Sequence, residues 1–422
     1  MHEQRIHQLV GHLFRHEAGK MAAVLTRLLG FNSLDLAEDI VQDTLLQALS
    51  TWKYKGIPEN PSAWLYTVAK RKAIDTIRQQ RMHAQHHSEI SLALKSEWTL
   101  SPTVNNLFLK NEIEDSQLRM IFACCHPSIP YESQLALILK TLCGLSVSEI
   151  AHSFLSNEET ITKRLYRARE KIREENISLE APVPANLPGR LDAVLHSLYL
   201  LFSEGYNSSH SDQLIRHDLC EEAMRLCFLL VNNQLTSSPK VEALLALMCF
   251  QASREGARLR SDGSIILLKD QDRLKWSQAL IEKGKYYLEH AAEGGVFTEY
   301  HIEAAIAGCH ARAESFEKTD WNQIIELYTV LERLKPNPII TLNKAIAIGY
   351  GKSAALGLEA LKNIKELSNH YLYHAAMGDF FSELGDREKA CASYESSLKL
   401  TKSNSEKKLL QTKITGITSS LA

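Results

Sequence analysis

The sequence predicts an all-α protein. Leu, Ala, Glu and Lys are abundant in its 422 residues, whereas Gly and Pro number only 19 and 11, and this composition favours helices over sheets. Apolar residues recur at helical spacing, most clearly between Asp35 and Thr51, as on the buried stripe of an amphipathic helix. Because the chain is too long for one ordinary core, we expect several helical domains.

The charge of the chain is balanced overall but uneven along its length. Its 48 Lys and Arg residues are offset by 50 Asp and Glu residues, which gives a net charge of −2. A protein that binds DNA unaided usually carries a basic excess. The positive charge gathers in two clusters, Lys70, Arg71, Lys72 and Arg78 in the first and Lys163, Arg164, Arg167, Arg169, Lys171 and Arg173 in the second. We therefore expect DNA contacts to be confined to these clusters and to need a protein partner.

The sequence predicts neither a membrane protein nor an enzyme. The apolar run from Ala243 to Phe250 is far shorter than a membrane span, and the first residues lack a secretory signal, so we expect a cytoplasmic protein. The eight cysteines show no CxxC spacing, and Cys124-Cys125-His126 would need further ligands to hold a metal. No catalytic Ser/His/Asp or Cys/His arrangement is recognisable. We expect no metal, no cofactor and no catalytic residue.

The most specific local pattern is a helix-turn-helix between Gly144 and Arg173. The turn is expected around Leu155, Ser156 and Asn157. In such a motif the second helix enters the major groove, where its first turns read base edges and later cations contact phosphates. The alternative is a solvated basic helix in a plain bundle. The outward residues of the second helix, which would contact DNA, are Glu158, Thr162, Lys163, Arg167 and Lys171.

Two more helices are expected before this motif, separated by a loop. The first, Asp35 to Thr51, carries Asp39, Gln42 and Asp43 on its polar side. Gly and Pro residues then interrupt the pattern, and Pro61 suits the first turn of a helix that extends to Arg81. Taken alone, the acidic side of the first helix would be read as merely solvated.

The order of these blocks resembles the extracytoplasmic-function sigma factors. The residues that carry the resemblance are Ala37 to Thr44, Asn60 to Arg78 and the helix-turn-helix. The resemblance implies a first domain that binds the β′ clamp helices of core RNA polymerase and melts the −10 promoter element. It implies a second domain that binds the β flap and reads the −35 element. The polymerase-binding residues would be Asp39, Gln42 and Asp43, and the −10 DNA-binding residues would be Trp52, Lys53, Asn60, Lys70, Arg71, Lys72 and Arg78.

One residue departs from that family pattern. Many members carry Asn where this chain has Arg71, so no base preference can be assigned to the position. The resemblance divides the chain into residues 1–82 (sigma domain 2), 83–115 (linker with one short helix) and 116–178 (sigma domain 4). A Pro-rich joint follows over residues 179–188, and a helical extension over residues 189–422.

The extension contains repeats that resemble tetratricopeptide units, clearest over residues 321–400. Gly378, Gly385 and Tyr394 fall at the spacings of such a unit, and degenerate copies precede it. Together with the segments Leu118 to Pro127, Leu201 to Tyr206 and Asp262 to Trp276, these repeats resemble a sigma-factor subgroup whose extension controls activity. The candidate residues for a protein or small-ligand regulator are Glu204, Tyr206, Asp262, Asp270, Asp272 and Arg273.

These candidate residues also have a structural interpretation. Asp262-Gly263 suits a turn, and Asp270 suits the N-cap of a helix that contains Trp276.

The sequence leaves two hypotheses about the function of the protein. The leading hypothesis is a non-enzymatic sigma factor that binds promoter DNA only with core polymerase. The rival is a stand-alone helix-turn-helix regulator with a protein-sensing repeat domain, which would bind operator DNA alone.

Overall fold

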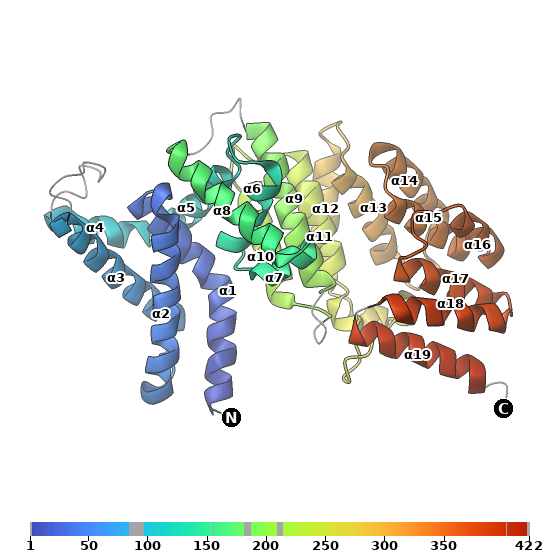
Figure 1. Ribbon diagram of the computed structural model, residues 1–422. Coiled ribbons are helices and arrows are strands. Elements are labelled where there is room, and N and C mark those ends of the chain that lie inside the picture. Colours follow the sequence, from blue (N-terminus) through green and yellow to red (C-terminus); the bar gives the residue numbers. More distant parts are fainter. Residues whose placement is uncertain are drawn as a thin grey trace. The chain divides into compact units, whose positions relative to one another are not determined.

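The computed structural model describes residues 2–83, 97–154, 156–180, 187–208, 214–401 and 403–419. These residues form α-helices, short 3-10 turns and one isolated antiparallel bridge between Leu259 and Ile265 (Figure 1). The all-α prediction is confirmed. No helix among them is both long and apolar enough to cross a bilayer.

The chain divides into two compact units. Unit 1 comprises residues 1–204 and 217–236, and unit 2 comprises residues 205–216 and 237–422. The helices that lie wholly or mainly in unit 1 are α1 (His2–Leu29), α2 (Leu34–Lys55), α3 (Pro61–His83), α4 (Glu97–Leu107), α5 (Lys110–Cys124), α6 (Tyr131–Thr141), α7 (Val147–Ser153), α8 (Glu158–Glu174), α9 (Leu187–Tyr206) and α10 (His217–Val231).

The N-terminal helices of unit 1 begin and end where local chemistry requires. Gly30, with φ +93°, and Gly56, with φ +79°, adopt backbone conformations that side chains disfavour, and they follow the ends of α1 and α2. Pro61 is the first residue of α3, as predicted. The apolar residues of α2 and α3 that were expected at helical spacing are largely buried, among them Ile40, Val41, Leu45, Leu65, Val68 and Ile77.

Helix α1 organises unit 1, since it packs on α2, α3, α5 and α10. Gly19 of α1 approaches the turn after α6 so closely that an added Cβ would lie 2.2 Å from the carbonyl oxygen of Leu142. Arg27 of α1 also lies 3.0 Å from the carboxylates of both Glu112 and Asp115. The segment predicted as a linker therefore contains α4 and the first turns of α5, within the fold of this unit.

Helices α9 and α10 are packed differently from the expectation of an independent extension. In α10, Arg225 donates to the Gln117 side chain of α5 at 3.2 Å and binds Glu222 at 2.7 Å. Most of the predicted joint, residues 181–186, lies outside the described residues. The chain after residue 187 thus contributes to both units, with residues 217–236 returning to unit 1 after residues 205–216 of unit 2. The predicted domain boundary stays a prediction.

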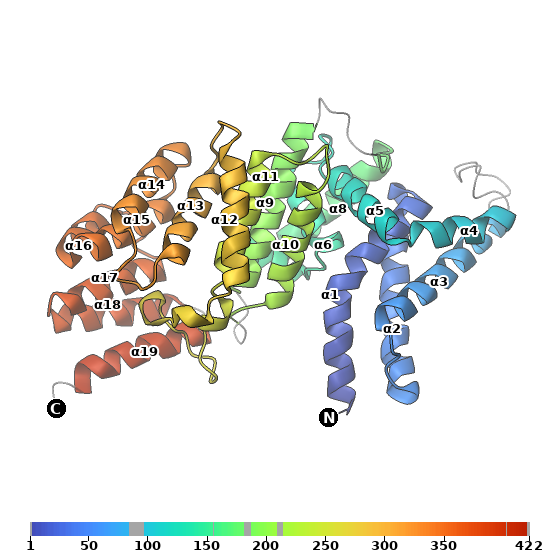
Figure 2. The ribbon, with the colours of Figure 1, turned by 180° about the vertical axis from the view of Figure 1, so that it is seen from behind.

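Unit 2 is built from successive helices that pack on their neighbours in sequence, as Figure 2 shows for α11, α12 and α13. An irregular segment with three 3-10 turns, residues 253–277, connects α11 to α12. The helices are α11 (Pro239–Ala252), α12 (Gln278–Ala292), α13 (Glu299–Arg312), α14 (Trp321–Leu334), α15 (Pro338–Gly351), α16 (Ala354–Lys362), α17 (Tyr371–Glu383), α18 (Arg387–Leu400) and α19 (Asn404–Ser419).

Small residues bring the helices of the predicted repeats into close contact. A Cβ on Gly357 would lie 2.6 Å from the Cα of Gly349, and one on Gly378 would lie 2.5 Å from the Tyr394 ring. Phe380 fills the space beside Gly349 and Gly357 and is 1% exposed. The predicted repeat residues thus lie at the contacts between α15, α16, α17 and α18, where one hairpin buries the apolar side of the next.

We predict that Gly357→Ala lowers the stability of unit 2 by about 1–3 kcal/mol, because the new methyl group meets backbone that cannot move aside. The matched control is Gly416→Ala in α19, where nothing lies within 4 Å of the new Cβ. That change should be neutral or stabilise by up to about 1 kcal/mol. Thermal unfolding midpoints of the full chain measure both, and equal midpoints for the two variants would contradict the packing described.

Candidate functional site

The segment predicted as a helix-turn-helix contains two well-capped helices, α7 and α8. At the start of α7, the Ser146 hydroxyl accepts from the Glu149 amide at 3.2 Å, and the Glu149 carboxylate accepts from the Ser146 amide at 2.6 Å. The Asn157 side chain accepts from the Thr160 amide at 2.8 Å at the start of α8. These caps satisfy amides that a helix leaves unpaired, so both helices begin at defined residues. Leu155, in the predicted turn, lies outside the described residues.

The residues of α8 predicted to contact DNA lie on its outer side. Lys163 pairs with Glu159 at 2.6 Å and Lys171 with Glu174 at 2.9 Å, but such exposed pairs are weak. Arg167 forms no ion pair within the described stretches. The inner stripe, Ile161, Leu165, Ala168 and Ile172, is buried. The outer residues are Glu158, Thr162, Lys163 and Arg167, which are exposed, and Lys171, which is partly exposed.

Two other arginines of α8 contact the beginning of α2. Arg169 donates to Glu38 at 2.7 Å and its Nε lies 2.9 Å from the Asp35 carboxylate, and Arg173 also binds Asp35. Burial raises the pKa of Glu38, although Arg169 acts in the opposite direction. Both arginines belong to the second basic cluster, to which DNA contacts were expected to be confined, although neither was among the residues predicted to contact DNA. The structure engages them within unit 1, where they hold α8 on α2.

The acidic side of α2 is open. Asp39, Gln42 and Asp43 are all exposed, and their spacing of three and four residues places them on one side of the helix. Lys72 of α3 lies 3.5 Å from the Asp43 carboxylate. Leu46 continues this side by one turn and is 62% exposed. The sequence analysis missed Leu46, although its spacing from Gln42 was a usable signal.

The basic residues of α3 form a second charged surface in unit 1. Arg71 and Arg78 are exposed, and Arg78 lies 3.9 Å from Asp75. Lys70 is partly buried with its ammonium 5.3 Å from the centre of the Phe108 ring, and burial lowers its pKa. Because of this packing, Lys70 is less accessible to DNA than the exposed Arg71 and Arg78.

One residue near the end of α2, Trp52, does not agree with the predicted −10 contact. Trp52 is 1% exposed, with its ring centre 5.4 Å from that of Trp64. Its ring is part of the core of unit 1 and cannot stack on a base without rearrangement. Lys53 and Asn60 are exposed, and the Asn60 side chain accepts from the Ala63 amide at 3.0 Å.

Two carboxylates of the predicted regulatory site, Asp262 and Asp272, accept hydrogen bonds from nearby backbone amides. Asp262 accepts from the Ser264 amide at 2.9 Å and from its hydroxyl at 2.6 Å, in the turn that Gly263 closes with φ +78°. Asp272 accepts from the Leu274 amide at 3.0 Å and caps a 3-10 turn. Asp272, not Asp270, is therefore the cap before Trp276, and the expectation for Asp270 was wrong.

The other candidates of this set are separated. Asp270 ends a different 3-10 turn, and Glu204 belongs to unit 1 whereas Tyr206 belongs to unit 2. Arg273 donates to the carbonyl of His310 at 2.7 Å and lies over the Trp276 ring. A regulatory site made of these six residues stays a prediction.

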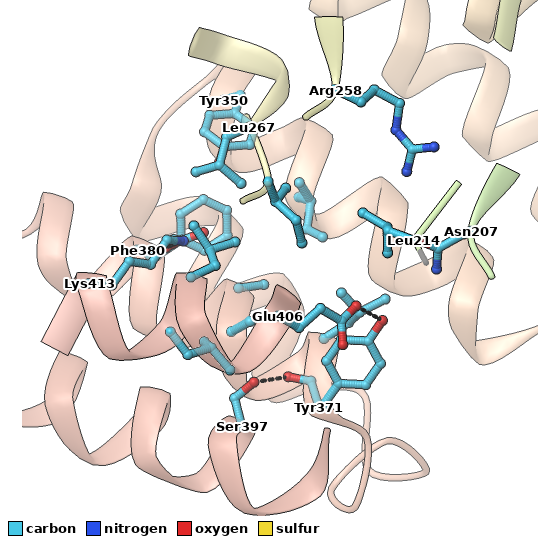
Figure 3. Close-up of a pocket in the computed structure, with 18 residues that line it drawn as sticks. Asn207, Leu214, Arg258, Leu267, Tyr350, Tyr371, Phe380, Ser397, Glu406 and Lys413 are labelled. Carbon is cyan, nitrogen blue, oxygen red and sulfur yellow. Dashed lines mark hydrogen bonds and ion pairs between the residues drawn. The ribbon is translucent and has the colours of Figure 1, made fainter. Parts of the chain in front are cut away.

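Unit 2 contains a cavity of about 320 Å³ (Figure 3) that no sequence pattern indicated. Its wall is mainly apolar, with Leu267, Tyr350 and Phe380 on one side. Its charged residues already have partners within the chain. Glu406 accepts from the Tyr371 hydroxyl at 2.7 Å, and Lys413 binds Asp379. Arg258 lies at the edge of the cavity.

Comparison with known proteins gives two family matches. Residues 13–82 match sigma-70 region 2, and residues 190–292 match a family of unknown function, DUF6596. The first match covers α2, α3 and most of α1. The second covers α10, α11, most of α9, α12 and the irregular segment between α11 and α12.

Three relatives are informative. The uncharacterized protein R00370 of Rhizobium meliloti is 35% identical over 379 residues, which cover 89% of this chain and 88% of that protein. RNA polymerase sigma factor SigV of Bacillus subtilis is 29% identical over 139 residues, 33% of this chain and 75% of SigV. A probable RNA polymerase sigma factor of Haemophilus influenzae is 24% identical over 165 residues, 36% of this chain and 84% of its own length.

The long match to R00370 and the region 2 match are independent of the charge and burial described above. The region 2 match covers α2 and α3, the helices that carry the acidic and basic surfaces described above. The chain belongs to the family of the Rhizobium protein and, through its N-terminal helices, to the sigma-70 family.

Proposed function

We propose that the protein is an RNA polymerase sigma factor of the extracytoplasmic-function type, with a C-terminal extension that regulates it. The observation that carries the proposal is the pairing of a region 2 match with a second, DNA-compatible surface on α8. A sigma factor needs one surface for core polymerase and further surfaces for promoter DNA. Unit 1 offers surfaces of both signs, and it needs no catalytic group for this task.

The acidic side of α2 is the candidate surface for polymerase. Asp39 and Asp43 are exposed, and Lys72 offsets Asp43 only weakly across 3.5 Å. An unpaired acidic surface attracts a basic partner and orients it. Leu46 adds exposed apolar area beside these charges, and a central apolar residue in a charged rim is a common arrangement at protein interfaces. We infer that the β′ clamp helices of core polymerase bind here.

Reversing both charges with Asp39→Lys and Asp43→Lys should weaken binding to core polymerase by about tenfold or more, because attraction becomes repulsion. Fluorescence anisotropy of labelled protein titrated with core enzyme measures the dissociation constant. The control is Glu293→Lys, an exposed position of unit 2. Unchanged affinity of the double variant would remove this side of α2 from the interface.

The outer side of α8 is the candidate reader of the −35 element. Its first turns present Glu158 and Thr162, and its middle presents Lys163 and Arg167. Polar residues at the start of a recognition helix read base edges, and cations farther along bind phosphates. Arg167, which has no ion-pair partner in the described part of the chain, can bind a phosphate without first breaking an internal pair.

Replacing Lys163 and Arg167 by Ala should reduce transcription from a −35-dependent promoter by about tenfold or more, since two phosphate contacts are lost. Core binding should stay unchanged, because α2 is untouched. Run-off transcription with saturating core enzyme measures the effect. The control, Lys362→Ala with Lys365→Ala, removes two exposed cations of unit 2 and so matches the change in charge. If the double variant and the control gave equal transcript, α8 would not be the DNA reader.

The −10 element is assigned to the surface of α3 and the preceding loop. Arg71 and Arg78 are exposed on α3, and Lys53 and Asn60 are exposed before it. Cations in a row with polar loop residues suit a single strand whose backbone is tracked while a base is extruded. Trp52 is left out of this surface because it is buried.

The rival function, a stand-alone regulator, differs in one observable. A stand-alone regulator would by itself retard duplex promoter DNA in a gel mobility assay, whereas a sigma factor should need core polymerase to bind that DNA. The overall net charge of −2 favours the second behaviour, because phosphate neutralisation supplies most unaided DNA affinity.

The regulatory part of the proposal concerns unit 2. Residues 1–236 contain all the contacts of unit 1, so a chain ending there keeps α9 and α10. Removing unit 2 should change transcript yield by about fivefold or more, as expected for a coupled regulatory domain. Circular dichroism and core binding control for folding. Equal yields from the full and shortened chains would mean that unit 2 has no regulatory part.

A further inference from the structure

A group of three arginines in unit 2 lies around aromatic rings. Arg254, two residues after α11, has its guanidinium carbon 5.3 Å from the centre of the Trp276 ring, and that of Arg273 lies 4.0 Å from the same ring. Trp276 is 3% exposed. The guanidinium carbon of Arg258 lies 3.8 Å from the Tyr206 ring. Stacking on aromatic faces partly compensates a cation that has lost water.

None of the three guanidinium groups has a carboxylate partner within the described residues. Arg254 donates to the Gln271 side-chain oxygen at 3.3 Å, Arg258 to the carbonyl of Tyr206 and Arg273 to the carbonyl of His310. One nitrogen of Arg273, Nη2, is buried without a hydrogen-bond partner. Neutral acceptors therefore satisfy only part of the donor capacity of these groups, because each guanidinium carries five N–H donors.

The electrostatics of the group confirm an excess of positive charge. Burial lowers the pKa of Arg254, and the charge of Arg258 adds to this effect. Burial and the charges of Arg254 and Arg273 lower the pKa of His310 to about 3. Among the carboxylates, Glu317 acts on Arg273 from a distance, in the direction that favours the charged form. Arg254, Arg258 and Arg273 are partly buried. Because a partly desolvated cation without a counter-charge is costly, such a group is expected to receive an anion.

The number of cations indicates the kind of anion. A carboxylate would neutralise one of three charges, whereas a phosphate monoester carries close to two and presents three acceptor oxygens. Guanidinium groups bind phosphate through paired N–H donors in a fork geometry that suits it. Arg258 also lies at the edge of the apolar cavity of about 320 Å³ (Figure 3). That cavity offers room for an organic group attached to the phosphate.

We propose that Arg254, Arg258 and Arg273 form a binding site for the phosphate group of a small phosphorylated metabolite, whose apolar part occupies the adjoining cavity. The site takes one residue from the predicted regulatory segment, Arg273, and none of its aspartates. It would give unit 2 a chemical signal to sense. The proposal concerns binding alone and does not depend on whether the protein is a sigma factor.

The test uses the full chain and two probes, inorganic phosphate and phenyl phosphate. Both should raise the thermal midpoint relative to potassium chloride at equal ionic strength. Phenyl phosphate should bind about tenfold or more tightly than phosphate, because its ring adds apolar burial in the cavity. Equal thermal midpoints in chloride and in both probes would overturn the proposal. Equal affinity of the two probes would overturn the part of the proposal that places the organic group in the cavity.

Variants separate binding from a purely structural role. Arg254→Gln should weaken phenyl phosphate binding by about tenfold or more in calorimetry. In phosphate-free buffer it should keep or raise the midpoint, because it removes a cation that lacks a counter-charge. Arg260→Gln is the matched control, since Arg260 is exposed and bonds only within its own turn. It should bind like the unmodified chain.

A second variant keeps the test valid if Arg254→Gln does not fold. Arg258→Gln leaves both arginines on Trp276 in place and should also weaken phenyl phosphate binding. If Arg254→Gln lowered the midpoint without phosphate and Arg258→Gln bound normally, the arginines would be structural and the proposal would fail. Binding of a glutamate-rich peptide, and not of phenyl phosphate, would likewise overturn it in favour of an acidic protein partner.

Discussion

Two arginines of α8 and two carboxylates at the start of α2 hold α8 on α2, and so join helices of unit 1 that lie more than a hundred residues apart. Arg169 contacts both Asp35 and Glu38, and Arg173 contacts Asp35. Removing Arg169 would leave the mostly buried Glu38 carboxylate without its partner, which is more costly than losing an exposed pair such as Arg173 with Asp35. The same pairs orient α8, so Lys163 and Arg167 face solvent. The charged residues proposed to bind polymerase and DNA are thus those that take no part in the contact between α8 and α2.

Much of the fold follows from local patterns, and these were predictable. The stripe of α2, the first residue of α3 and the glycines between repeat helices each depend on neighbours within a turn or one hairpin. Long-range packing was not predictable in the same way. Nothing local to α10 shows that Arg225 will bind Gln117 of α5. Similarly, Trp52 stands beside exposed loop residues in sequence, yet it packs on Trp64 in the core.

The charged surfaces show the same division. The exposed residues Asp39, Gln42 and Asp43 were correctly placed on one side of α2, because helical spacing alone decides that. Helical spacing also placed Arg167, and not Arg169, among the outward residues of α8, but it could not show what Arg169 would contact. Their different roles arise from Asp35 and Glu38, more than a hundred residues earlier. A charge run in sequence therefore indicates a polar helix surface, but only tertiary contacts decide which of its charges remain available.

In the irregular segment of unit 2, the aspartates are weaker indicators of a ligand site than the arginines. Asp262 and Asp272 accept hydrogen bonds from nearby amides, as short acidic side chains commonly do in turns and caps. Within the described residues, these two carboxylates bind local amides and form no ion pair with Arg254, Arg258 or Arg273. Because the backbone takes the acceptors, the cations of the segment are left with aromatic rings and neutral oxygens. The turn chemistry that shapes this segment is therefore also the reason that it has positive charge to offer a ligand.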